Sequence, residues 1–227
     1  IKDVFTIDSL PEAFDQNFFD TTSFTKFAVV VGNSTWEVLQ AKKALQVEWE
    51  AEPERSFTIA GKPAKFPAGL ESTATHRQQM EELSRMPGTV VRKDGDPETA
   101  FKNATTILER SYSAPFLAHN TMEPVNCFAH VSADKAELYG PIQAPEFILG
   151  TLSQRLGLPK EKIHIRLARM GGGFGRRAYG HHFIEAAVIS QHVQAPIRLQ
   201  YTREDEMTAG IYRPSYSATF RAALDAN

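Results

Sequence analysis

The order of apolar and polar positions predicts mixed helices and strands from the start of the chain. Residues 27–31 form a continuous apolar run, which is typical of a buried strand, and residues 47–49 alternate between apolar and polar. Between them, Ser34 and Glu37 have the spacing of a capping box, in which each side chain accepts from the other's backbone N–H at a helix start. These elements predict a small β-α-β unit over residues 1–54.

The rest of the pattern extends this picture to the end of the chain. Prolines and glycines in residues 51–70 predict a linker, and the acidic residues 204–206 predict a solvated helix start. Further helices are expected at 72–86, from 97 to 104, at 145–156 and at 183–193, and further strands at 89–91, 105–112, 126–131, 135–139, 163–168, 197–201 and 216–222. The predicted fold class is therefore α+β.

The strongest local signal is a cluster of four glycines within five positions, residues 171–175. One glycine would be enough to connect the strand at 163–168 to the helix at 183–193. Several glycines together let the backbone pass close to a ligand with its N–H groups pointing at it. A loop between a strand and a helix start is a common place to hold a phosphate or an oxyanion.

Two nucleotide motifs compete for this loop. Residues 173–178 satisfy the dinucleotide pattern G-x-G-x-x-G/A, but the preceding strand alternates with charged residues, and Glu204 and Asp205 come too late for the ribose contact. A P-loop is excluded because no lysine–serine or lysine–threonine pair follows the glycines.

His181 and His182 are adjacent on the helix and point in different directions, so they are not expected to chelate a metal ion as a pair.

Two other segments carry candidate site residues. Residues 115–126 mix polar and apolar positions and predict a partly buried loop, in which His119 and Glu123 serve either a structural network or the wall of a site. Gln143 lies just before the helix that starts at Pro145, where it can be a simple turn residue or a donor near a helix N-terminus.

Composition narrows the function classes. The net charge is −2 without a basic tract, which argues against nucleic acid as the main partner. No apolar run approaches the roughly 20 residues of a membrane-spanning helix. The single cysteine, Cys127, excludes an internal disulfide and any iron–sulfur cluster built by this chain alone, so electron transfer needs another chain. Turn residues at 225–227 follow a strand directly, and we expect a fragment of a longer polypeptide.

Residues 169–175 resemble the glycine-rich loop of the xanthine oxidase family of molybdenum hydroxylases. The resemblance covers nearly the whole chain, because further matching segments come in the order that this family uses. Residues 119–126 and the pair Arg176-Arg177 are similar especially to the large subunit of isoquinoline 1-oxidoreductase and its aldehyde-oxidising relatives. The resemblance implies the C-terminal part of a hammerhead-type domain at 1–54 and the N-terminal part of a molybdopterin-binding domain at 55–227.

The resemblance also implies a cofactor and a reaction. The family binds a molybdenum–pterin cofactor, usually the cytosine dinucleotide form in bacteria, and inserts oxygen from water into a C–H bond of an N-heterocycle or an aldehyde. Electrons then pass to a small iron–sulfur subunit or domain. The residues implied in cofactor binding are Gln143, Gly172, Gly173, Phe174, Gly175 and Arg176, and those implied in the site wall are His119, Glu123 and Ala178. No side chain is expected to ligate the metal directly.

Two departures from the family pattern limit what this chain is expected to do. Ala178 stands where the purine-oxidising branch carries a glutamate, which argues against xanthine as a substrate. The family's catalytic base is a glutamate in a segment that nothing in 1–227 matches, so we expect no catalytic residue here and no activity of this chain by itself. The compartment lies between bacterial periplasm and cytoplasm, with the periplasm favoured by the resemblance. The alternatives are a cofactor-free binding or scaffold module and, more weakly, a nicotinamide enzyme.

Overall fold

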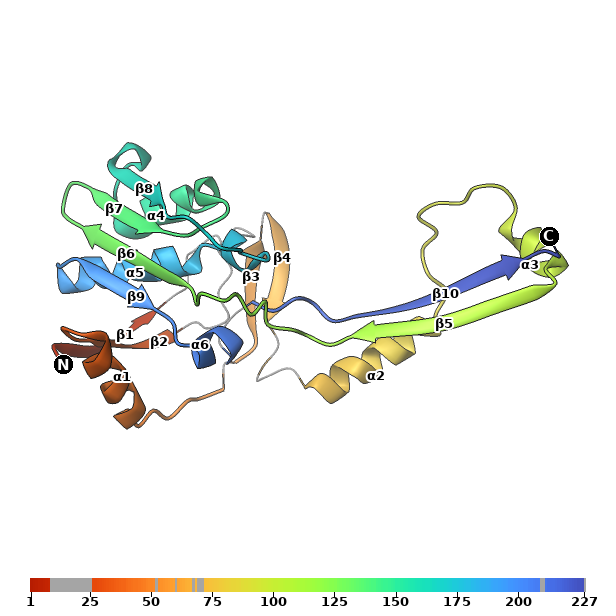
Figure 1. The fold of residues 1–227 in the computed structure, drawn as a ribbon, viewed down its shortest axis with the longest axis horizontal. Helices are drawn as coiled ribbons and strands as arrows, with labels where there is room; N and C mark the ends of the chain where they lie inside the picture. Colours follow the sequence, from red (N-terminus) through yellow and green to blue (C-terminus); the bar gives the residue numbers. More distant parts are fainter. Residues whose placement is uncertain are drawn as a thin grey trace. The chain divides into compact units, whose positions relative to one another are not determined.

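The computed structural model describes residues 1–8, 26–51, 53–59, 61–66, 68, 72–208 and 211–226. They form two compact units, one of Ile1–Ala68 with Ala118–Tyr212 and one of Gly69–Leu117 with Arg213–Asn227. The elements, in chain order, are β1 (Asp3–Asp8), β2 (Lys26–Val31), α1 (Thr35–Ala44), β3 (Arg55–Ile59), β4 (Lys62–Phe66), α2 (Thr73–Ser84), α3 (Pro97–Asn103), β5 (Thr106–Ala114), β6 (Asn126–Val131), β7 (Ala136–Gly140), η2 (Pro145–Ile148), α4 (Leu149–Leu156), η3 (Lys160–Lys162), β8 (Ile163–Leu167), η4 (Arg176–Ala178), α5 (His181–Val193), β9 (Ile197–Gln200), α6 (Arg203–Thr208) and β10 (Tyr216–Leu224) (Figure 1).

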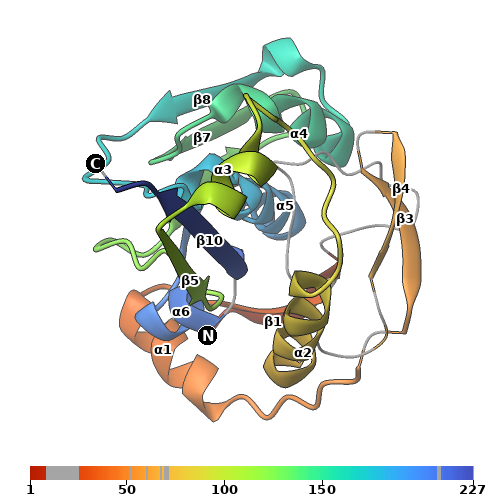
Figure 2. The same ribbon diagram turned by 90° about the vertical axis from the view of Figure 1, so that its right-hand side faces the viewer.

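The core of the first unit is a four-stranded sheet covered by two helices. The strand order is β8-β7-β6-β9, with β7 and β8 parallel and the other pairs antiparallel. Helices α4 and α5 contact each other and pack against these strands (Figure 2). Inward-pointing residues such as Ala129 and Leu138 alternate with exposed ones, as expected for a sheet with one covered face. They pack against Leu152 and Phe183 in one apolar cluster.

The two covering helices form for reasons visible in the sequence. In α4, Leu152 and Leu156 are buried at helical spacing, and Gly157 ends the helix with φ 68°, a left-handed conformation that glycine adopts without strain. Helix α5 is buried over most of its length. The predicted hairpin of 126–131 and 135–139 and the predicted strands 163–168 and 197–201 are confirmed within one or two residues.

The predicted β-α-β unit near the start of the chain is wrong in its order. Strand β2 pairs with β1 in an antiparallel ladder from Asp3↔Val31 to Asp8↔Lys26, and α1 follows both strands. Residues 47–49 form no strand, and Trp49 is 64% exposed. Three alternating residues cannot form a ladder without a neighbouring strand to accept their hydrogen bonds.

The start of α1 agrees with the predicted cap in one of its two bonds. Ser34 Oγ accepts from the backbone N–H of Glu37 over 3.3 Å, as a capping box requires. The Glu37 carboxylate accepts from the backbone N–H of Asn33 over 3.1 Å, one residue earlier than the box predicts.

The predicted linker at 51–70 contains regular structure where it is described. Strands β3 and β4 form an antiparallel hairpin from Arg55↔Phe66 to Ile59↔Lys62. Gly61 lies in the turn with φ 75°, which explains why a glycine stands there. The described part of the predicted linker is therefore a hairpin with Pro63 inside β4, and residues 52, 60, 67, 69 and 70 lie outside the described residues.

The second unit is a long antiparallel ribbon with two helices. Strands β5 and β10 pair from Tyr216↔Ala114 to Leu224↔Thr106, and α2 and α3 contact β10 (Figure 1). The predicted helices at 72–86 and from Pro97 are confirmed, with Ser72 and Asp96 as N-caps. The predicted strand at 89–91 is wrong, and Val91 is 95% exposed.

The domain boundary predicted between residues 54 and 55 stays a prediction.

Within the described ranges, no helix combines the length and the apolar character needed to cross a membrane.

Candidate functional site

The glycine loop follows β8 and has a backbone that requires several of its glycines. Gly172 has φ 142° and Gly175 has φ 87°, conformations that other residues adopt only with strain. Phe174 lies between them with φ 50°, and its side chain is 60% exposed. The loop then enters the short helix η4 through a hydrogen bond from Arg176 N to Gly173 O of 2.8 Å.

Gln143 lies directly against this loop. Its backbone N–H donates to Arg177 O over 2.8 Å, which fixes the end of β7 against η4. A Cβ atom built on Gly173 would be 2.3 Å from Gln143 Oε1 and 3.0 Å from Met170 Sδ. Gly173 therefore leaves the space that the Gln143 amide occupies. Gln143 remains exposed on its other side.

The segment 118–126, hereafter the histidine loop, packs against the glycine loop. His119 Nδ1 donates to the carbonyl of Phe174 over 2.7 Å. The guanidinium of Arg177, itself fully buried, donates to the backbone carbonyl of Glu123 over 2.6 Å and to its carboxylate over 2.9 Å. The structure thus brings together His119 and Glu123 of the histidine loop, Gln143 and the glycine loop, which lie in three separate segments of the sequence.

Two other predicted site residues have different surroundings. Ala178 is half-buried at the end of η4, and its N–H donates to Gly175 O over 3.2 Å. The Arg176 side chain points into the interior, with its Nε 3.0 Å from Glu206 Oε1. Its predicted contact with a cofactor stays a prediction, and the side chain as it stands serves an internal ion pair.

The glycine loop offers backbone donors. Among the residues that the structure describes, the amides of Gly172, Gly173 and Gly175 donate no backbone–backbone hydrogen bond. Backbone N–H groups that are fixed in place and not used by the fold can bind an anionic or oxygen-rich group. The arrangement can therefore bind such a group with donors from the loop and from the Gln143 amide.

The role of Glu206 is not visible in the sequence pattern. The acidic residues 204–206 predict a solvated helix start, but Glu206 is 3% exposed and its Oε2 accepts from Val125 N over 2.9 Å. Its neighbours Glu204 and Asp205 carry the same charge, and nothing in the local pattern distinguishes Glu206 from them.

Buried titratable groups lie behind the glycine loop on α5. Burial is the main cause that lowers the pKa of His181 and brings that of His182 to about 3, and the Arg176 charge acts in the same direction. Burial raises the pKa of Glu185 to about 7, although Tyr201 donates to its Oε2 over 2.7 Å. The two histidine rings stand edge to face, with centroids 5.6 Å apart.

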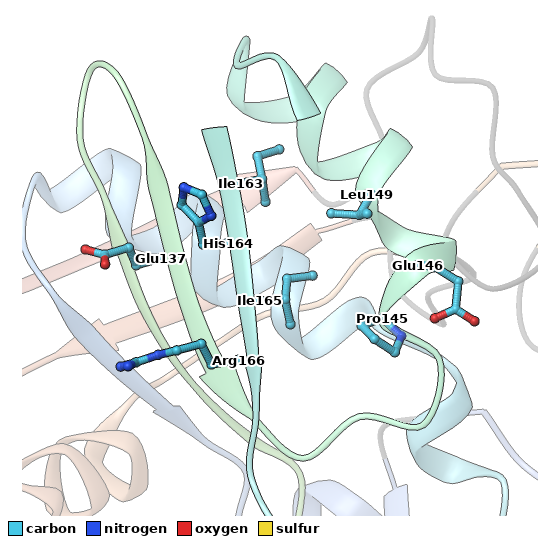
Figure 3. A pocket seen from close by; sticks show the side chains of 8 residues that line it. All are labelled: Glu137, Pro145, Glu146, Leu149, Ile163, His164, Ile165 and Arg166. Carbon is cyan, nitrogen blue, oxygen red and sulfur yellow. The ribbon is translucent and has the colours of Figure 1, made fainter. Parts of the chain in front are cut away.

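A separate hollow of about 640 Å³ borders β8 and the segment η2–α4. In Figure 3, the side chains of Ile163 and Ile165 point toward Leu149 and Pro145. His164 and Arg166, the residues that alternate with them in β8, point to the other side of the strand. None of the candidate residues lines it. Its lining residues are Glu137, Pro145, Glu146, Leu149, Ile163, His164, Ile165 and Arg166.

Comparison with known protein families gives a match over most of the chain. Residues 81–227 match the family model described as "Molybdopterin cofactor-binding domain". This range includes Gln143, the histidine loop and the glycine loop.

Three individual proteins are similar over most of the chain. A membrane-bound aldehyde dehydrogenase (pyrroloquinoline-quinone) of Gluconacetobacter polyoxogenes is 28% identical over 202 residues, covering 88% of this chain and 25% of the relative. Subunit beta of isoquinoline 1-oxidoreductase of Brevundimonas diminuta is 27% identical over 201 residues, covering 86% of this chain and 24% of the relative. The structure of quinoline 2-oxidoreductase from Pseudomonas putida 86 is 19% identical with a TM-score of 0.61, covering 88% of this chain and 25% of that chain. The chain thus spans about a quarter of the length of these relatives, and the last comparison concerns the fold alone.

Proposed function

The chain belongs to the family of molybdopterin cofactor-binding domains, and from this premise we propose that it is part of a molybdenum-dependent oxidoreductase of the xanthine oxidase type. The proposed substrates of the whole protein are N-heterocycles of the isoquinoline kind or aldehydes. The names of two relatives, an isoquinoline oxidoreductase subunit and an aldehyde dehydrogenase, support both substrate classes.

The observation that carries this proposal is the contact between the Gln143 side chain and the glycine loop. The cofactor is rich in oxygen atoms and carries a phosphate, and the residues fit such a group in two respects. The amides of Gly172, Gly173 and Gly175 donate to no backbone carbonyl within the described part of the chain. The side chain of Gln143 is held beside them where Gly173 has no Cβ, and it is exposed to a ligand.

In this proposal each part of the site has a separate task. The glycine loop donates backbone hydrogen bonds, and Gln143 donates or accepts through its amide. His119 holds the carbonyl of Phe174, so that the loop keeps its conformation. The bound cofactor would supply the two-electron chemistry. Ala178 leaves room where a glutamate would orient a purine, which favours other heterocycles or aldehydes.

The finer points of the proposal rest on the sequence resemblance. They are the cytosine dinucleotide form of the cofactor, a small iron–sulfur partner that takes the electrons, oxygen that comes from water, and a catalytic base contributed from outside 1–227. They also include a hammerhead-type domain at 1–54, a molybdopterin domain at 55–227, a periplasmic location and the inactivity of this chain by itself. The alternative remains a scaffold module that keeps the fold without the chemistry.

Metal and cofactor analysis of the whole protein tests the proposal. After expression in a host that makes the cofactor, we expect molybdenum and a pterin nucleotide near one per chain. Absence of both would leave the scaffold module as the better explanation. A bound pyrroloquinoline quinone in place of molybdenum would also contradict the proposal, and the name of one relative makes this control necessary.

Replacing Gln143 by alanine in the whole protein is expected to lower kcat by about 10- to 100-fold, because a fixed hydrogen-bonding group is lost at the reacting site. The free energy of unfolding should change by less than about 0.5 kcal/mol, since the side chain is exposed. The matched control is Gln154→Ala, an exposed glutamine on α4 that should keep wild-type turnover. A wild-type rate in Gln143→Ala would remove this residue from the site.

A further inference from the structure

A buried ion pair lies directly behind the glycine loop. Arg176 Nε and Glu206 Oε1 are 3.0 Å apart, and each side chain is 1% exposed. The other carboxylate oxygen of Glu206 accepts from Val125 N over 2.9 Å, and Arg176 Nη1 lies 3.0 Å from His181 Nε2. A single carboxylate therefore joins the end of the glycine loop to the end of the histidine loop.

Helix α6 holds the histidine loop at a second place. Arg203, three residues before Glu206, donates to the Asn120 side chain over 2.9 Å and to the carbonyls of Thr121 and Met122 over 2.6 and 2.8 Å. The helix start is itself fixed, because Thr202 and Asp205 cap each other. Two side chains on one turn of α6 thus bind the histidine loop at residues 120–122 and at Val125.

This ion pair differs from the other link between the two loops. Arg177 pairs with Glu123, but Glu123 is 56% exposed, so water competes for its carboxylate. The Glu206 side chain, by contrast, is buried away from the solvent. Burying two charges is costly, and a buried pair is seldom more stabilising than a well-packed apolar pair. We therefore expect the ion pair to fix the geometry of the two loops and to contribute little to the free energy of unfolding.

We propose that Glu206 and Arg176 are positioning residues that hold the glycine loop in register with the histidine loop. They fix the amides of residues 172–175 relative to His119 and Gln143 without touching a ligand themselves. The statement that the positioned groups face a cofactor rests on the proposed function. The coupling of the two loops by the ion pair does not depend on that function.

The test replaces the pair in the whole protein by apolar residues, Arg176→Met with Glu206→Leu, so that no unpaired charge stays buried. Hydrogen exchange is followed by mass spectrometry in peptides covering 119–126, 170–178 and α5, in parallel with molybdenum content and steady-state kinetics. The matched control is Arg221→Met with Glu109→Leu, an ion pair of 2.9 Å at the surface of the ribbon. A second double variant, Arg176→Gln with Glu206→Gln, also leaves no charge buried and keeps an acceptor for Val125 N.

We expect exchange in the peptides 119–126 and 170–178 to be at least about tenfold faster in the Met/Leu double variant, with α5 unchanged, because the loops open locally. We also expect kcat to fall about tenfold with KM nearly constant, since the donors are misplaced. The surface control should change neither. If α5 also exchanges faster in the Met/Leu variant, the Gln/Gln variant decides. Faster exchange confined to the two loops supports the proposal, and faster exchange spread equally over α5 overturns it.

Wild-type exchange in both loops would overturn the proposal whatever the kinetics. Faster exchange in both loops with unchanged turnover would support the coupling and count instead against the proposed function, because the loosened loops would then not form the site.

Discussion

Replacing Gly173 by alanine is expected to lower the turnover of the whole protein by about 100-fold, the size of effect seen when a fixed donor at a reacting centre is lost. The backbone itself would accept alanine, because Gly173 is not among the residues with positive φ. The new methyl group would instead occupy the place of Gln143 Oε1, which lies 2.3 Å from the ideal Cβ position. The end of the Gln143 side chain is flexible and can move away, so we expect the fold to survive and the site to be lost.

The matched control is Gly171→Ala, two residues earlier in the same loop. A Cβ atom on Gly171 meets nothing within 4 Å, and its φ is not positive either, so this variant should keep wild-type turnover. The double variant Gly173→Ala with Gln143→Ala gives a further check. If the methyl group acts by displacing Gln143, it should add little once Gln143 is gone, and the two effects should be strongly non-additive. Fully additive losses, or normal turnover of Gly173→Ala, would contradict the argument. Initial rates and thermal unfolding of the purified proteins provide the measurement.

The parts of this site that the sequence predicted are those with a local signature. Four glycines in five positions exceed what a turn needs, and a glutamine before Pro145 points to a helix start. The structure adds the reason why these two places meet: β7 and β8 are parallel neighbours, so the segments that leave their ends lie side by side. A parallel pair joins segments distant in sequence, and no pattern within either segment indicates the register.

The failures also have physical causes. A pattern of three residues, the alternation at 47–49 or the β-prone run at 89–91, is too short to separate a strand from an extended connection, and only a neighbouring strand decides it. The role of Glu206 depends on a partner 30 residues earlier in the chain, Arg176. A buried ion pair is visible in a sequence only once the fold has brought its members together. For His119 and Glu123 the sequence left two alternatives open, a structural hydrogen-bond network or the wall of a site. Both side chains take part in a hydrogen-bond network, and their place in the wall of a site stays a prediction.

The second large effect concerns pH and Glu185. This residue lies on α5 with its side chain buried, and its Oε2 accepts from the Tyr201 hydroxyl over 2.7 Å. Burial raises its pKa from 4.5 to about 7, against the smaller opposing influences of Tyr201, Arg176 and Arg155. At a pH between these two pKa values, Glu185 keeps its proton in the folded protein but has released it in the unfolded chain. The free energy of unfolding therefore falls as the pH rises through this range, by up to about 3 kcal/mol.

Glu185→Gln should remove this loss, because an amide stays neutral at every pH and can still accept from Tyr201. We expect the variant to be more stable relative to the wild type at pH 8 than at pH 5, with the difference growing by about 2 to 3 kcal/mol. His181 and His182, whose pKa values burial lowers, destabilise the fold as the pH falls, but they are present in both proteins and cancel in the comparison. Urea unfolding at the two pH values measures the difference, with the exposed Glu161→Gln as control. An equal difference at pH 5 and pH 8 would mean that Glu185 ionises in the folded protein as it does in water, and that the interior behind the glycine loop is more polar than its burial indicates.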